Sequence, residues 1–165
     1  MIKITRNNPF VLLRVNNYKD NSFINVHREY IEEYGSVWML KVGRRIPEER
    51  LLGILNSDGV VVLKGPKAVD DQFYAAHIVD GYYGLPKDEM TFPDYYYDMI
   101  DDENLVNMEN GLEGTWFCVD KIVPIPHDIV NSFSLLRTGE KVEVVLNKTR
   151  TSMLYVLSDI DCTLV

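Results

Sequence analysis

The sequence has few of the residues that build metal sites, disulfides and membrane spans. It contains two cysteines, Cys118 and Cys162, and three histidines, and no CxxC pair or His-rich stretch joins them. A zinc site is therefore not expected, and both thiols are expected to be reduced and inert. No run of about eighteen apolar residues occurs, and the N-terminal segment lacks the apolar core and cleavage site of a signal peptide. These absences predict a soluble, cytoplasmic protein with no cofactor and no membrane partner.

Common catalytic and phosphate-binding motifs are absent as well. Neither GxGxxG nor GxxxxGK[ST] occurs, and there is no GxSxG nucleophile turn. Asp101 and Asp102 could be imagined as an acid-base pair or as a magnesium site, but adjacent acids in an acidic loop are far more often solvated surface. At their spacing in a strand, His77 and Asp80 point to opposite faces, which does not favour a catalytic dyad. We therefore expect a protein that is not an enzyme.

Basic residues are missing from one long stretch. Ten of the 25 acidic residues lie between Asp88 and Asp120, where there is no Lys, Arg or His, and the whole chain has a net charge of -8. The rest of the chain is slightly positive, because it contains all 17 basic residues and only 15 of the acidic ones. Basic residues also gather between Lys41 and Lys67. This pattern leaves two alternatives open, a local patch that contacts phosphates and an ordinary mixed surface.

The spacing of apolar residues predicts alternating strands and helices in the first half of the chain and mainly strands afterwards. This order disfavours a doubly wound parallel sheet. It predicts a single α+β domain over residues 1–165, a small and mostly antiparallel β-barrel flanked by short helices. Strands are expected over 9–18, 36–43, 60–65, 72–83 and 114–126, helices over 25–35 and 46–59, a short helix or turn over 127–136, and a final pair of strands within 141–159.

Residues 85–111 form the least regular part of the sequence. This segment combines prolines, acids and the three consecutive residues Tyr95, Tyr96 and Tyr97. Its aromatic residues argue against disorder, because disordered segments are depleted in them. Long ordered loops in compact domains are commonly functional. We expect an acidic, Tyr-rich insertion with one helical turn after Pro93.

Aromatic residues are the most distinctive feature of the chain, and several are adjacent in strands. Because neighbouring residues of a strand point to opposite faces, one of Trp116 and Phe117 must leave the main core. It is then covered by a helix, covered by residues 85–111, or part of a pocket wall. Trp38 lies near the start of a strand that is apolar on both faces, so it is either core or at a cavity mouth with its N–H free for a ligand.

An aromatic pocket beside Lys and Arg suits a flat ring that carries a phosphate. Stacking on an aromatic side chain contributes on the order of 1–3 kcal/mol per base, while cations hold the backbone. A flipped-out or single-stranded base fits this description. The sequence therefore favours a nucleic-acid ligand with an exposed base.

Four segments occur in an order that resembles the PUA-like superfamily, especially its EVE and YTH branches. They are HREYIEEYGSVWMLKVGR, GVVVLKG, QFYAAHIVDGYY and GTWFCVDKIVPIP, within about residues 26–155. Members of that superfamily are small β-barrels that bind modified nucleobases in aromatic cages, and several serve bacterial defence against phage. The resemblance rests on element order, on the Trp after YGS and on the WF strand.

The resemblance implies a non-catalytic module that recognises a modified base in DNA or RNA, in a defence or restriction context that can include an effector protein. Trp38 and Trp116 would form the cage, and Tyr82, Tyr83 or one of Tyr95 to Tyr97 could close it. The acidic stretch departs from this pattern and supports an alternative, a protein-interaction module or inhibitor that engages a basic partner through residues Asp88 to Asp120. The implied ligand-binding residues are Ser36, Trp38, Tyr82, Tyr83 and Trp116, and the implied phosphate contacts are Lys41, Arg44, Arg45 and Lys64.

Overall fold

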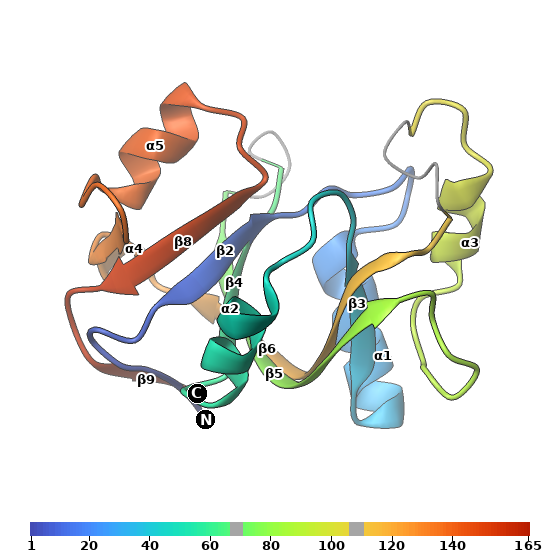
Figure 1. The fold of residues 1–165 in the computed structure, drawn as a ribbon, viewed down its shortest axis with the longest axis horizontal. Coiled ribbons are helices and arrows are strands. Elements are labelled where there is room, and N and C mark those ends of the chain that lie inside the picture. The colour runs from blue at the N-terminus through green and yellow to red at the C-terminus, as the bar shows by residue number, and fades with distance from the viewer. Residues whose placement is uncertain (67–70, 106–110) are drawn as a thin grey trace.

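A seven-stranded sheet organises the computed structural model, which describes residues 1–66, 71–105 and 111–165 (Figure 1). The strand order is β3-β6-β5-β4-β2-β8-β7, and β2 and β4 are the one parallel pair in this order. A separate antiparallel pair joins β1 (Ile2–Ile4) to β9 (Cys162–Leu164). The sheet strands are β2 (Phe10–Arg14), β3 (Val37–Lys41), β4 (Val60–Lys64), β5 (Phe73–Gly84), β6 (Gly114–Ile125), β7 (Phe133–Leu135) and β8 (Met153–Ser158).

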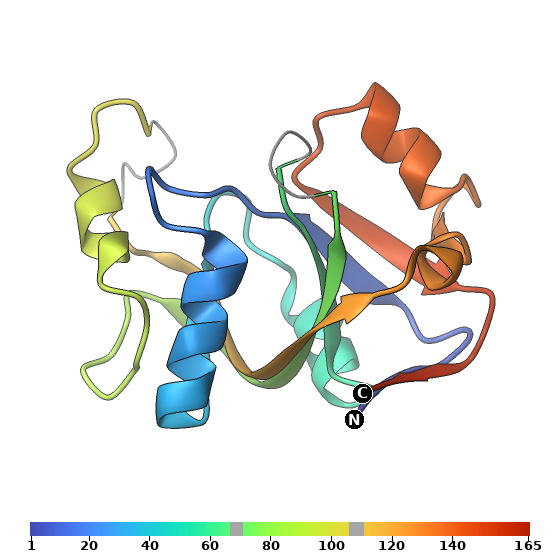
Figure 2. The same ribbon diagram turned by 180° about the vertical axis from the view of Figure 1, so that it is seen from behind.

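Five short helices surround the sheet within the described ranges. They are α1 (Phe23–Tyr34), α2 (Glu48–Leu55), α3 (Tyr95–Ile100), α4 (His127–Val130) and α5 (Val142–Lys148). Figure 1 shows α4, α5 and β8 at one end of the molecule and α3 at the other, with α2 in front. From behind, α1 lies in front instead (Figure 2). Across residues 1–66, 71–105 and 111–165, no helix is both long and apolar enough to cross a membrane.

Helix α1 begins after a serine cap and ends at a glycine. The Ser22 hydroxyl accepts a hydrogen bond from the Asn25 N–H, which is the usual role of a serine before a first turn. Gly35 ends the helix at a φ of 86°, a left-handed conformation that glycine adopts without a steric penalty, and its N–H donates to the Ile31 carbonyl. The helix expected over 25–35 is therefore confirmed, with an earlier start.

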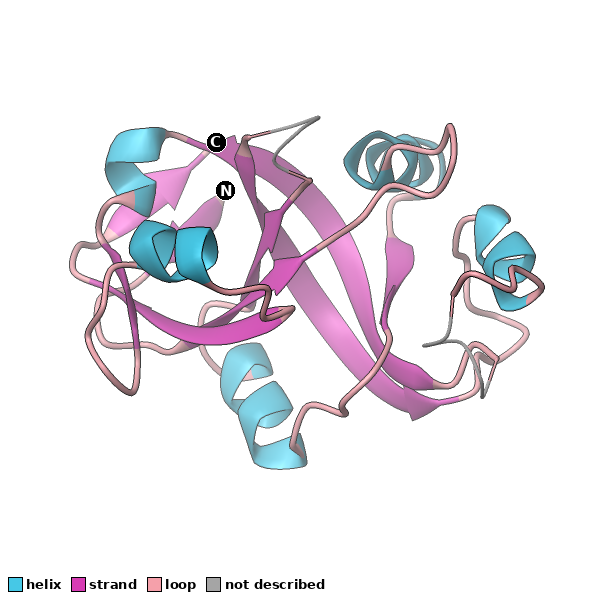
Figure 3. Cartoon of the chain, turned by 90° about the horizontal axis from the view of Figure 1, so that it is seen from above, coloured by secondary structure: helices cyan, strands magenta, loops and turns pink. Residues whose placement is uncertain are grey.

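The predicted α+β class and mostly antiparallel sheet are confirmed, but the sheet is not closed into a barrel. Its order ends at β3 and β7, and no pairing joins these two edges among the described residues. Two long strands, β5 and β6, curve through the molecule from one end to the other (Figure 3). Their pairing shifts register on both sides of Ile78, where a bulge bends the strands. The sheet is therefore strongly curved and open.

The prediction of two strands within 141–159 is wrong for the first of them. Residues Val142–Lys148 form α5, whereas Met153–Ser158 form the expected strand β8. The run VEVV alternates like a strand, but Val142, Val145 and Leu146 also recur at helical spacing. Val142 and Val145 are buried and Val144 is exposed, so tertiary packing selects the helical period.

The adjacent rings of Trp116 and Phe117 enter two different clusters. Phe117 packs with Val37 and Met39 in a core on one face of the sheet. Trp116 lies on the other face, in a cluster with Tyr95 and Tyr96 of α3, and it has no exposed surface. The ring that leaves the main core is thus Trp116, and residues of the 85–105 segment cover it. The helical turn expected after Pro93 is α3.

Candidate ligand-binding site

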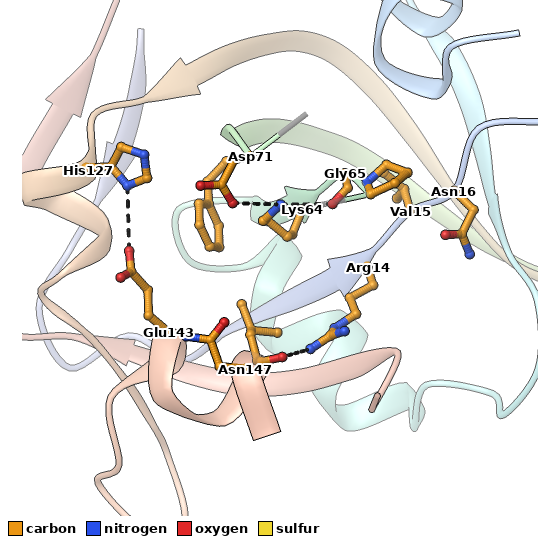
Figure 4. Close-up of a pocket in the computed structure, with 12 residues that line it drawn as sticks. Arg14, Val15, Asn16, Lys64, Gly65, Asp71, His127, Glu143 and Asn147 are labelled. Carbon is orange, nitrogen blue, oxygen red and sulfur yellow. Dashed lines mark hydrogen bonds and ion pairs between the residues drawn. The ribbon is translucent and has the colours of Figure 1, made fainter. Parts of the chain in front are cut away.

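Two adjoining pockets open where β2 ends, and they share Arg14, Val15 and Asn16. In Figure 1 this end of β2 lies between the part with α4, α5 and β8 and the part with α1, β3 and α3. The aromatic pocket has a volume of about 360 Å³ and is lined by Leu13, Arg14, Val15, Asn16, Phe23, Met39, Leu40, Lys41, Val42, Gly43, Tyr95, Tyr96, Met99 and Ser152. The polar pocket has a volume of about 250 Å³ and is lined by Arg14, Val15, Asn16, Lys64, Gly65, Pro66, Asp71, Phe73, His127, Glu143, Leu146 and Asn147 (Figure 4).

A tight connection between β2 and α1 places Phe23 in the wall of the aromatic pocket. The Val15 N–H donates to the Lys64 carbonyl at 2.9 Å and prolongs the pairing of β2 with β4. The chain then turns, because Tyr18 and Asn21 exchange backbone hydrogen bonds at 3.0 and 2.8 Å. The Asn17 side-chain oxygen accepts the Phe23 N–H at 3.0 Å, which fixes the first residue of the helix. A strand end and a helix start therefore meet at the pocket.

A buried histidine joins three walls of the aromatic pocket. His27 Nδ1 lies 2.6 Å from the Phe23 carbonyl oxygen, and Nε2 lies 2.5 Å from the Tyr96 hydroxyl oxygen. Since a carbonyl only accepts, Nδ1 carries the proton and Nε2 accepts from the hydroxyl. The Tyr96 oxygen in turn accepts the Leu40 N–H at 3.4 Å. Complete burial lowers the pKa of His27 to about 4 and holds the ring neutral.

Helix α3 supplies the aromatic wall of this pocket. Tyr95 is buried and stacks on Tyr18, with ring centres 6.0 Å apart and planes 10° from parallel. The Tyr18 hydroxyl donates to the Asp102 carboxylate at 3.0 Å, so the acidic segment is fastened to the turn before α1. Burial raises the pKa of the Tyr95 hydroxyl. The Tyr-rich insertion therefore builds the site instead of merely covering the sheet.

The charges that line the aromatic pocket are positive. Lys41 is 9% exposed, and its Nζ donates to the carbonyls of Val42 and Arg44 at 3.2 and 2.5 Å. Burial lowers the pKa of Lys41. Arg14 Nη2 donates to the carbonyls of Leu146 and Thr149 at 2.5 and 2.8 Å. No acidic side chain is among the described residues that line this pocket, so its potential favours an anionic group.

The polar pocket, in contrast, holds charges of both signs. Lys64 Nζ lies 3.6 Å from the Asp71 carboxylate, and His127 Nδ1 lies 3.6 Å from Glu143 Oε1 (Figure 4). Arg14 adds a second cation from β2. The pocket therefore offers both donors and acceptors of hydrogen bonds.

Three of the ligand-binding residues implied by the sequence line a different cavity, the Trp38 groove. It lies where α2 approaches β5 beyond Asp80, a stretch of β5 that pairs with β6 alone in the described chain. Its acidic residues, Glu48, Asp80 and Glu89, outnumber its single cation, Lys87. The groove has a volume of about 590 Å³ and is lined by Trp38, Glu48, Leu51, Leu52, Leu55, Asp80, Gly81, Tyr82, Tyr83, Lys87, Glu89 and Met90.

The structure does not bring Trp38 and Trp116 into one cavity. Trp38 is partly exposed at the groove, whereas Trp116 is fully buried and lies outside both pockets and the groove. The Trp116 indole N–H donates to the Gly84 carbonyl at 3.1 Å, and the ring packs 5.1 Å from Phe92, centre to centre. Of the two alternatives that the sequence left open, Trp116 is a core residue and Trp38 lies at the mouth of a cavity.

The four residues that the resemblance implies as phosphate contacts do not lie in one cavity either. Lys41 lines the aromatic pocket and Lys64 the polar pocket. The Arg45 guanidinium lies 3.7 Å from the centre of the Tyr83 ring, and Arg44 is exposed. Ser36 is half-buried before β3, outside the two pockets and the groove, and Lys67 falls outside the described residues.

Sequence reasoning missed Arg14, Asn16 and Phe23. Arg14 ends a buried strand, and Phe23 lies nine positions further along the chain. The signal was the polar run NNYKDN between a strand and a helix, since such a run turns the chain and brings both ends to one place.

Comparisons of this chain with protein-family models, curated proteins and solved structures return no match. The geometry of the site is therefore the main support for any function.

Proposed function

We propose that this chain is a non-catalytic module that recognises a modified nucleobase in the aromatic pocket. One observation carries the proposal: the rings of Phe23, Tyr95 and Tyr96 line a cavity that also contains Arg14 and Lys41 and no acidic side chain. A volume of about 360 Å³ lies within the range of ordinary small-molecule pockets. Rings beside cations are the chemistry expected from the sequence, which supports the proposal. Tyr95, Tyr96 and Lys41 keep their expected place in it, while Phe23 and Arg14 replace the two tryptophans and the other cations.

The same proposal covers the finer classification of the fold. A curved, mostly antiparallel sheet with short helices and two long central strands is what an open variant of a PUA-like barrel would have. The order of segments that resembles the EVE and YTH branches supports this interpretation. Helix α3 then takes the place of a loop that closes the base pocket.

The apolar share of the lining favours a base that carries a methyl group. Leu13, Met39 and Met99 contribute aliphatic or thioether surface to the pocket. Burying one methyl group contributes about 0.8 kcal/mol, which corresponds to an affinity about fourfold higher than for the plain base. Arg14 and Lys41 would hold the phosphate of the same nucleotide.

Titration calorimetry at low salt tests the proposal directly. Plain and methylated nucleoside monophosphates are titrated into the wild type, into Tyr95→Leu and into Tyr97→Leu. Tyr97 is in the same helix but is 57% exposed and does not line the pocket, so it is the matched control. Loss of one stacking ring costs about 1–3 kcal/mol, so Tyr95→Leu should weaken binding at least fivefold and Tyr97→Leu should not. Equal losses in both variants would contradict the proposed pocket.

The rival proposal is an interaction module that engages a basic partner through residues Asp88 to Asp120. The described acidic residues of that stretch are largely exposed, which is compatible with a docking surface. The same titrations discriminate the two proposals. A wild type that binds none of the nucleotides favours the basic partner.

A further inference from the structure

The Trp38 groove lies beside an open edge of the sheet. Strand β4 pairs with residues 73–77 of β5, and the Ile78 N–H adds one more hydrogen bond, to the Gly59 carbonyl at 2.7 Å. Residues 80–84 pair with β6 on one side, and no strand of the described ranges pairs with their other side. Such an edge offers backbone donors and acceptors to another chain.

Two edges of the sheet are covered differently. At β3, the Thr91 carbonyl of the same chain accepts the Trp38 N–H at 2.8 Å. At the end of β5, the Gly81 N–H donates to the exposed carboxylate of Asp80 at 2.8 Å. An exposed side chain can turn away, so the backbone carbonyl of another chain can take its place.

The residues that line the groove come from both faces of the sheet. Trp38 and Tyr82 pack in the cluster of Trp116, whereas Leu51 and Leu55 pack in the core on the opposite face. The groove therefore passes around the edge of β5. A β-strand fits such a groove, because its side chains alternate between two faces and reach both walls.

The two walls of the groove differ in chemistry. Asp80, Cys118 and Trp38 form one row across three strands, so the carboxylate and the indole lie on the same face. Glu89 adds a second carboxylate to the groove. The other wall is α2, which contributes three leucines and Glu48. The first wall suits cationic side chains, which carboxylates and aromatic faces both attract, and the second suits apolar ones.

We infer that the groove docks a partner protein, by adding an extended basic segment of that partner to β5 as a further strand. In this binding mode, backbone hydrogen bonds to the edge supply affinity and the alternating side chains supply specificity. The segment is basic because the groove holds three carboxylates and one lysine, and because the whole chain has a net charge of -8. The inference goes beyond the proposed function, since the groove and the aromatic pocket share no lining residue among the described ones.

Titration calorimetry at low salt with capped heptapeptides tests the inference. At about 3.3 Å per residue, residues 80–84 span about 16 Å, so a heptapeptide covers the open edge. In the first peptide arginine and valine alternate, and the second contains the same residues in two blocks. The alternating peptide should bind and shift the tryptophan emission to shorter wavelength, because it covers Trp38 while Trp116 has no exposed surface. The block-ordered peptide should bind at least about tenfold more weakly, because it cannot match both walls and lose no hydrogen bond.

Two further peptides test the added strand itself. Each is the alternating peptide with N-methyl groups on every second backbone amide, in one of the two possible phases. Only one side of an added strand meets β5, so one phase should bind at least about tenfold more weakly and the other like the parent peptide. Two phases that bind equally would mean that the edge is not used.

Two double variants separate the groove from the net charge. Asp80→Asn with Glu89→Gln removes two carboxylates from the groove and should weaken binding of the alternating peptide about fivefold. Glu29→Gln with Glu32→Gln is the control, because it changes the net charge equally on the exposed surface of α1, away from α2 (Figure 2). This control should bind the peptide like the wild type.

Equal losses in the two double variants would mean attraction by net charge alone and would overturn the inference. A wild type that binds the alternating and block-ordered peptides equally, or binds neither, overturns it as well. Nucleotide binding is measured on the same protein. Loss of either activity leaves the other in place, so the failure of this inference and the failure of the proposed function are distinguishable.

Discussion

The aromatic pocket and the Trp38 groove are both lined by aromatic rings, but their charges differ in sign. The pocket combines Arg14 and Lys41 with no acidic side chain among its described lining residues. The groove contains three carboxylates and one lysine. Aromatic content alone therefore does not distinguish the two cavities, since the charge beside the rings decides which ligand is attracted.

The rings of both regions also contact other side chains of the same chain. In the groove, Lys87 Nζ lies 4.8 Å from the centre of the Tyr82 ring, and the Arg45 guanidinium covers Tyr83. Cations of the same chain therefore already lie against one face of each of these two rings. In the pocket, Tyr95 stacks on Tyr18 and Phe23 stacks on His27. Rings are therefore in contact with other side chains in both regions, and the charges of the lining residues are what separate the two.

The largest expected effect concerns His27, which holds the walls of the pocket and has no counterpart in the groove. Its pKa falls from 6.5 to about 4 on folding, so the unfolded chain binds a proton between these values that the native chain does not. The contribution of His27 to the free energy of unfolding is therefore complete above about pH 6.5. It decreases as the pH falls toward 4, by about 3 kcal/mol in total. Urea unfolding of the wild type at several pH values measures this slope.

His27→Gln is the control for that measurement, because glutamine keeps a donor and an acceptor but does not titrate. Carboxylates contribute equally to both proteins, so the difference between the two curves isolates the histidine. Between about pH 7.5 and about pH 5 the wild type should lose about 2 kcal/mol more than the variant. Parallel curves would mean that His27 is not neutral and buried in the native state.

The next effect separates the two regions by ligand binding. Trp38→Leu removes the largest ring of the groove, and we expect its nucleotide affinity to stay within about twofold of the wild type. Tyr95→Leu removes one stacking surface of the pocket and should cost about 1–3 kcal/mol of binding. Both affinities come from calorimetry, with circular dichroism to confirm that each variant is folded. A large loss in Trp38→Leu alone would move the nucleotide site to the groove and restore the cage residue expected from the sequence.

Local patterns were sufficient for much of the fold. Apolar periodicity placed β3, β4, β5, β6, α1 and α2 close to their observed bounds, and the tyrosines after Pro93 indicated an ordered segment with a helical turn. The VEVV run of α5 was ambiguous, because both periods fit its valines. Only packing against β7 and β8 distinguishes them, and packing is not visible in a short window of sequence.

The position of the candidate site could not be predicted from local patterns, because it depends on contacts between residues far apart in the sequence. Two contacts decide whether Trp38 or Trp116 stays accessible. The Thr91 carbonyl accepts the backbone N–H of Trp38 at 2.8 Å, and α3 covers the Trp116 ring. The pairing of Tyr96 with His27 joins residues 69 positions apart. Such contacts follow from the fold as a whole, so the sequence alone could not indicate which of the predicted aromatic residues line one cavity.

The last expected effects concern stability and come from one glycine in each region. A Cβ on Gly114 would lie 2.8 Å from the backbone oxygen of Lys41, so Gly114→Ala must displace the end of β3 beside the pocket and should cost about 1–3 kcal/mol of stability. A Cβ on Gly53 in α2, beside the groove, meets nothing within 4 Å, so Gly53→Ala should stabilise by about 0.5–1 kcal/mol through helix propensity. Thermal unfolding measures both changes, and nucleotide titration should show weaker binding for Gly114→Ala alone. Weaker binding in Gly53→Ala would show that α2 and the groove contribute to the nucleotide site, against the separation of the two regions.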